Sequence, residues 1–93
     1  MDVRRIVGAN VRKYRLAANL SQEELALRVE LVDQGYISGL EVGRRNPTAI
    51  MLWLIARALE IDPGQLFSTD GFTEKWAQGP VVISSTRSGR KRV

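Results

Sequence analysis

One stretch of the chain limits what it can fold into more than any other: residues 21–46, which read SQEELALRVELVDQGYISGLEVGRRN. Ser21 stands three residues before Glu24, and this spacing predicts a capping box at the start of a short helix. Asp33 is the expected N-cap of a second short helix. So few residues separate the two helices that only a tight turn fits between them.

The second helix of this stretch has two different sides. Its apolar residues, Ile37 and Leu40, recur at helical spacing and should be buried. Small or polar residues are expected on its outward side, namely Gln34, Gly35, Ser38 and Gly39. A helix with amide, hydroxyl and glycine groups at its exposed start can approach another surface closely. We therefore interpret residues 21–41 as a helix-turn-helix motif.

Three segments resemble, in order, the phage-repressor-like helix-turn-helix family, the Cro/cI type also called XRE: VGANVRKYRLAANLSQEELALRV, YISGLEVGRRNPT and LWLIARALEID. The likeness spans roughly residues 3–67 and implies an all-α, five-helix lambda-repressor-like domain. In the family the second helix of the motif lies in the major groove of double-stranded DNA, and dimers place two such helices on successive half-sites. The resemblance therefore implies a transcription regulator, such as a repressor, that binds a (pseudo)palindromic operator as a dimer.

The resemblance also implies roles for single residues. Base readout falls to the exposed start of the second helix, at Gln34, Gly35, Tyr36 and Ser38. Phosphate contact falls to Gln22. The loop after the motif reads GRRNP and adds exposed donors that suit phosphate oxygens: Arg44, Arg45 and Asn46.

A structural ion pair is implied between Arg15 and Glu41, where it would fix the recognition helix relative to the first helix of the chain. Two features depart from the family pattern. Glu30 stands where the family usually has glycine, and the turn from Glu30 to Asp33 is one residue longer than usual. These departures are the support for one alternative, a protein-interaction module whose motif no longer meets DNA.

The remaining elements follow from apolar spacing and helix caps. The first helix should run from about Val3 to Ala18, with one apolar face: Val3, Ile6, Val7, Val11, Tyr14 and Ala18. Asn19 should take the left-handed conformation that ends it. Thr48 should cap a helix that continues to about Leu59, and a short fifth helix should start near Asp62.

The helix after Thr48 is apolar nearly all round, although only one stripe of it is needed for the core. Its outer stripe follows i, i+3, i+4 and i+7 spacing: Ile50, Trp53, Leu54 and Arg57. Such a stripe left in water favours aggregation. We expect a second copy of the chain to cover it in a homodimer, and the alternative is that later apolar residues of the same chain do so.

Composition excludes several classes of function. The 93 residues suffice for one small domain, placed at 1–67, and an extension at 68–93. A net charge of +4 favours an anionic partner. Cysteine and histidine are absent, so disulfides and the usual zinc sites are excluded. No nucleophile, base or phosphate loop forms a constellation, which predicts no enzyme, cofactor or metal. Without an apolar run of membrane-spanning length, the expectation is a cytoplasmic protein with no membrane contact.

The extension is rich in small and polar residues. Residues 73–78 could form a helical turn or two and residues 81–84 could be extended, while the basic residues of 87–92 indicate a flexible arm or a solubilising end. A tail of this kind supports a second functional hypothesis, an antitoxin or adaptor whose tail binds a partner protein.

Overall fold

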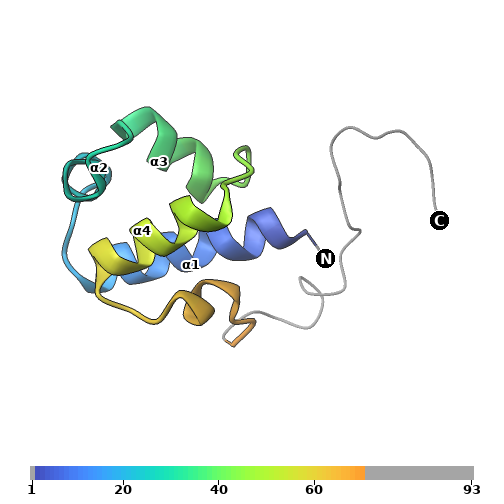
Figure 1. Ribbon diagram of the computed structural model, residues 1–93. Coiled ribbons are helices and arrows are strands. Elements are labelled where there is room, and N and C mark those ends of the chain that lie inside the picture. The colour runs from blue at the N-terminus through green and yellow to red at the C-terminus, as the bar shows by residue number, and fades with distance from the viewer. Residues whose placement is uncertain (1, 71–93) are drawn as a thin grey trace.

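The computed structural model describes residues 2–70, and every regular element within them is a helix (Figure 1). The elements in order are α1 (Val3–Ala17), α2 (Gln22–Val29), α3 (Gln34–Glu41), α4 (Ala49–Leu59) and a 3-10 helix, η1 (Pro63–Phe67). The expected all-α class is confirmed for this part of the chain. The number five is wrong for α-helices, because the fifth element is a 3-10 helix. An α-helix is disfavoured in this five-residue element, because Pro63 lacks an N–H and Gly64 is a weak helix former.

The helix starts are fixed by side chains that accept hydrogen bonds from backbone N–H groups. These N-caps are Asp2, Ser21, Asp33, Thr48 and Asp62. The capping box of α2 is complete, since Ser21 Oγ lies 2.9 Å from Glu24 N and Glu24 Oε1 lies 2.8 Å from Ser21 N. Capping satisfies donors that would otherwise lack a partner, and each cap is typically worth about 1 kcal/mol.

Among residues 2–70, three non-glycine residues take the left-handed conformation where a helix ends. Asn19 follows α1 with a φ of 61°, as expected. Glu30 ends α2 with a φ of 72°, and Glu60 ends α4 with a φ of 59°. Glu30 therefore adopts the backbone conformation that glycine usually supplies at this place, so the departure from the family pattern leaves the turn intact.

The core lies where α3 packs against both α1 and α2, where α4 packs against α2 and α1, and where η1 packs against α1 and α4 (Figure 1). Its buried members come from every helix: Val7, Val11, Leu20, Leu25, Ala26, Val29, Ile37, Leu40, Ile55, Ala56, Leu59 and Leu66. The expected apolar face of α1 is wrong at both ends, because Val3 is 53% exposed and Ala18 is also exposed. Helical spacing assigns a face, but it does not tell where the neighbouring helices stop covering it.

Two residues of α1 determine how closely α3 and the end of η1 pack against it. Gly8 faces the end of α3, where an added Cβ would overlap the carbonyl oxygen of Leu40. Asn10 is buried, and its Nδ2 donates to the carbonyl oxygens of Leu66, at 2.9 Å, and Ser68, at 2.8 Å. α1 thus holds both α3 and the end of η1.

The expectations for the helical turn at 73–78, the extended segment at 81–84 and the basic arm at 87–92 lie outside the described residues. None of the helices in the described part of the chain is long and apolar enough to cross a membrane.

Candidate functional site

The exposed starts of α2 and α3 meet through their first residues. Gln22 is half-buried and Gln34 is exposed, and Gln34 Nε2 donates to Gln22 Oε1 at 2.7 Å. Gln22 Nε2 donates in turn to Glu41 Oε1 at 3.0 Å. The two amides are therefore joined side by side at the edge of the motif, although the sequence interpretation had given them separate roles. The sequence does contain one indication of this contact, because Gln22 and Gln34 are each the first residue of their helix.

This chain of hydrogen bonds ends in an ion pair at the core. Arg15 Nε lies 2.6 Å from Glu41 Oε2, and Arg15 Nη2 lies 3.1 Å from Glu41 Oε1. Arg15 Nη1 donates to the carbonyl oxygen of Leu20 at 2.8 Å. The two side chains are only 9% and 2% exposed. We call Gln34, Gln22, Glu41 and Arg15 the amide network.

The amide network sets which way each glutamine points. A carboxylate paired with arginine offers only acceptors, so Gln22 must turn its Nε2 toward Glu41 and its Oε1 toward Gln34. Gln34 must then donate through its own Nε2. Within residues 2–70, the Gln34 Oε1 and the second Nε2 hydrogen have no hydrogen-bond partner, so both are available to an external one. An acceptor beside a donor is the pattern that pairs with the N6 and N7 atoms of adenine.

The other residues expected to read bases lie along α3. Gly35 is exposed, while Tyr36 and Ser38 are half-buried. Burial raises the pKa of the Tyr36 phenol, and the nearby positive charge of Arg45 opposes that rise. The phenol is therefore neutral at neutral pH and can act as a hydrogen-bond donor. Gly39 was expected to face outward, but it is buried, because the side chain of Arg45 lies across it.

The loop after α3 carries the residues expected to contact phosphate. Gly43 takes a φ of 81°, and the backbone N–H of Arg44 donates to the carbonyl oxygen of Gly39 at 2.9 Å, so the loop is tied to the helix end. Arg44, Arg45 and Asn46 are all exposed. The loop therefore presents two guanidinium groups and one amide beside α3.

The outer stripe of α4 is exposed to solvent. Ile50 is 74% exposed, Trp53 is 51% exposed and Leu54 is half-buried. The guanidinium carbon of Arg57 lies 5.4 Å from the centroid of the Trp53 ring. We call these four residues the α4 stripe, in which three apolar side chains are followed by the cation of Arg57.

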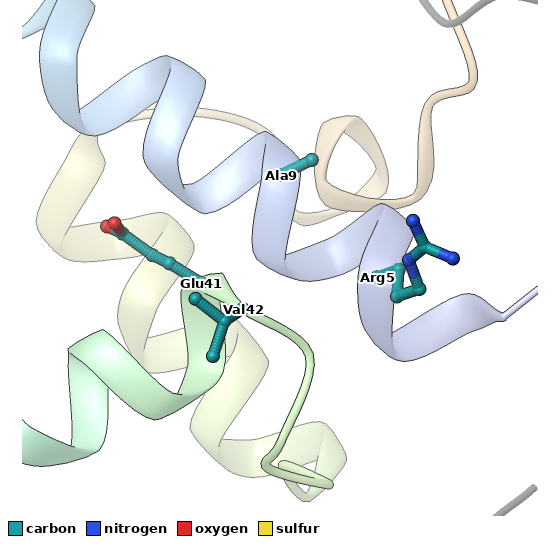
Figure 2. A pocket seen from close by; sticks show the side chains of 4 residues that line it. All are labelled: Arg5, Ala9, Glu41 and Val42. Atoms are coloured by element: carbon teal, nitrogen blue, oxygen red, sulfur yellow. The ribbon is translucent and has the colours of Figure 1, made fainter. Parts of the chain in front are cut away.

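A shallow hollow of about 250 Å³ lies between α1 and the end of α3, lined by Arg5, Ala9, Glu41 and Val42. Figure 2 shows the Glu41 carboxylate turned away from Arg5. The hollow lies at the opposite end of α3 from Gln34, so it does not belong to the edge formed by the two glutamines. Within residues 2–70, no group of three acidic side chains is arranged to hold a metal ion.

Comparison with known proteins adds sequence and structural relatives. A family model described as helix-turn-helix matches residues 11–66. An uncharacterized HTH-type transcriptional regulator of Sinorhizobium fredii, y4dJ, is 44% identical over 66 residues, which cover 71% of this chain and 84% of that protein.

Two solved structures of restriction-modification controller proteins are similar as well. C.AhdI from Aeromonas hydrophila is 38% identical with a TM-score of 0.66, over 69% of this chain and 91% of that chain. The C.Esp1396I tetramer in complex with its natural 35 base-pair operator is 35% identical with a TM-score of 0.63, over 70% of this chain and 84% of that chain.

Proposed function

Since the chain belongs to the helix-turn-helix family of DNA-binding transcription regulators, the XRE type, we propose that it is a sequence-specific regulator of the Cro/cI kind. It binds a pseudopalindromic double-stranded operator as a homodimer and acts by occupying that operator, with no catalytic step and no cofactor. Residues 1–67 form the DNA-binding domain and residues 68–93 an extension, and the protein acts in the cytoplasm.

The amide network is the observation that carries this proposal. Gln34 offers one acceptor and one donor from the exposed start of α3, and the remaining contacts of the network fix its orientation. Because a preorganised side chain loses little entropy on binding, such a group discriminates between bases better than a mobile one. Gln34 reads an adenine, with Gly35, Tyr36 and Ser38 beside it in the major groove.

Phosphate contacts position the motif without reading sequence. Gln22 lies at the start of α2, where the positive end of the helix dipole favours an anion such as phosphate. Arg44 and Asn46 are exposed in the loop at the end of α3 and supply further donors. Replacing Arg44 should therefore weaken binding to all duplexes alike and reduce the salt dependence of binding.

Dimerisation through the α4 stripe completes the site. One short recognition helix contacts too few base pairs to select an operator, whereas a two-fold pair reads two half-sites. A second copy of the α4 stripe would bury Ile50 and Trp53, which are 74% and 51% exposed. The solved complex of the relative C.Esp1396I is a tetramer on its operator, which supports an oligomeric mode of binding.

A more specific form of the proposal is control of a restriction-modification system. Its support is the likeness to C.AhdI, of which this chain covers 91%. The discriminating observation is the genomic neighbourhood, because restriction and modification genes beside its own gene would favour a controller. A toxin-like reading frame there would favour the antitoxin hypothesis instead.

Electrophoretic titration over a salt series tests the proposed function. The protein should bind its operator at physiological salt with an affinity roughly 10³- to 10⁷-fold above that for unrelated DNA, and Gln34→Ala should reduce that ratio. The matched control is Glu23→Gln, which changes an exposed residue of α2 outside the amide network. Equal affinity for all duplexes would leave only nonspecific binding, and the proposal would be wrong.

A further inference from the structure

The side chain of Arg45 does not extend from its loop into solvent but runs back along α3. An ideal Cβ built on Gly39 would lie 3.1 Å from Arg45 Nε and 3.3 Å from Arg45 Cγ. Glycine is therefore the residue that lets the aliphatic part of Arg45 lie against the helix. Contact along the stem, and not only at its charged end, fixes the path of the side chain.

The guanidinium group of Arg45 ends over an aromatic ring of the same helix. Its central carbon lies 5.2 Å from the centroid of the Tyr36 ring, within the range of a cation–π contact. Tyr36 is half-buried, so the ring is itself held in place. Tyr36 and Gly39 are three residues apart and together form a shelf on which Arg45 rests.

The Gly39 end of the shelf is turned away from the core, whereas the Tyr36 ring also packs against the edge of the core. Ile37 and Leu40 are fully buried on the inner side of α3. At 100° per residue, Gly39 lies well over 90° from the mean direction of these two residues, as does Gly35. Arg45 thus covers the outward side of the recognition helix, where Gly35 and Ser38 are also found. An arginine that only contacts phosphate could extend from the loop and would not need to lie along α3.

The donors of Arg45 are available to an external partner, since the ion pairs among residues 2–70 join Arg4 to Asp2 and Arg15 to Glu41 and leave Arg45 without a carboxylate. We propose that Arg45 is a specificity-determining residue that reads a guanine in the major groove. This inference rests on the proposed DNA-binding function and revises the phosphate role expected for Arg45 from the sequence. A planar guanidinium presents two parallel N–H groups that match guanine O6 and N7.

Charge-preserving substitutions separate base readout from phosphate contact. Arg45→Lys keeps the positive charge but loses the planar fork and the stacking on Tyr36. Arg44→Lys is the matched control, because Arg44 is the neighbouring exposed arginine of the same loop and is not on the shelf. Gly39→Ala is a third variant that keeps both arginines and crowds the Arg45 stem with a Cβ, so that the stem must shift slightly, while its gain in helix propensity favours folding.

The experiment begins with an operator selected by the parent protein from random duplexes. Affinities of the parent and of the three variants are then measured for that operator and for duplexes that differ from it at single base pairs. We expect one G·C pair in each half-site whose replacement costs the parent roughly 5- to 150-fold in affinity. Arg45→Lys should lose most of that preference, Gly39→Ala should lose part of it, and Arg44→Lys should keep it.

Two results overturn the inference alone. One is an Arg45→Lys variant that keeps the parent's preference at every base pair, and the other is a Gly39→Ala variant that weakens all duplexes by the same factor. Failure of the proposed function would look different, because the parent protein itself would then select no sequence from random DNA.

Discussion

Removing one partner of the ion pair between Arg15 and Glu41 should destabilise the domain far more than removing both. Arg15→Met leaves the Glu41 carboxylate, whose side chain is 2% exposed, with the Gln22 amide as its remaining side-chain partner within residues 2–70. Glu41→Leu leaves the guanidinium of Arg15 with the carbonyl oxygen of Leu20, at 2.8 Å. In each variant a charge stays buried without its counter-charge, and that is the source of the cost.

The expected cost follows from burial. Breaking a buried ion pair by removing one partner costs about 3 to 5 kcal/mol. A domain of this size has a total stability of about 3 to 10 kcal/mol at the usual 0.05 to 0.15 kcal/mol per residue. Glu41→Leu should cost less than Arg15→Met, since a long arginine side chain can turn its charged end toward water. The double variant, which leaves no unpaired charge, should lie within about 2 kcal/mol of the parent.

Urea unfolding followed by far-ultraviolet circular dichroism measures these differences as free energies of unfolding. Protein concentration must be held constant across the four proteins, because dimerisation adds to apparent stability. The double-mutant cycle then gives the coupling between the two residues. Single variants within 1 kcal/mol of the parent, or a double variant as unstable as the sum of the two singles, would refute the reasoning.

Three further predictions follow from other contacts. Gly8→Ala should lower the melting temperature, because the added Cβ meets the backbone of α3 and overpacking of this kind costs about 1 to 3 kcal/mol. Gly35→Ala is the control and should not lower the melting temperature, because its Cβ meets only Asp33 Oδ1, at 3.5 Å. Hydrogen bonds from the backbone and side chain of Ser21 hold the pKa of Glu24 below its ordinary value of 4.5. The stabilising effect of the Glu24 carboxylate is therefore present above that value and lost as pH falls through the lowered pKa, so the difference in melting temperature between the parent and Glu24→Gln should shrink in acid. Trp53→Glu should shift the protein from dimer to monomer in sedimentation at micromolar concentration, and a parent that is itself monomeric there would remove the proposed interface.

Local features of this fold could be predicted from the sequence because their partners are near in the chain. The capping box of α2 joins residues three apart, and the N-cap of α4 at Thr48 accepts from Met51, also three residues on. The left-handed residue at Asn19 likewise depends on the ending of a single helix. In each case the atoms that stabilise the feature lie within one helical turn of it, so residue type and spacing were sufficient.

Features that join distant segments could not be predicted in this way. Asn10 is a polar residue on a helix face, and only the fold brings the carbonyl oxygens of Leu66 and Ser68 to its amide. Gly39 has an outward position in the helical pattern, yet it is buried because Arg45 folds back from the following loop. The direction of a long side chain depends on the surface it rests on, and sequence spacing does not contain that information.

Selection of binding sites from random double-stranded DNA by the parent protein tests the central claim most directly. The account predicts an inverted repeat whose two half-sites are centred about 10 to 10.5 base pairs apart, or a multiple of that spacing, with one position in each half-site that loses its preference in Gln34→Ala. Enrichment of no sequence, or of a single half-site without a symmetric partner, would contradict it.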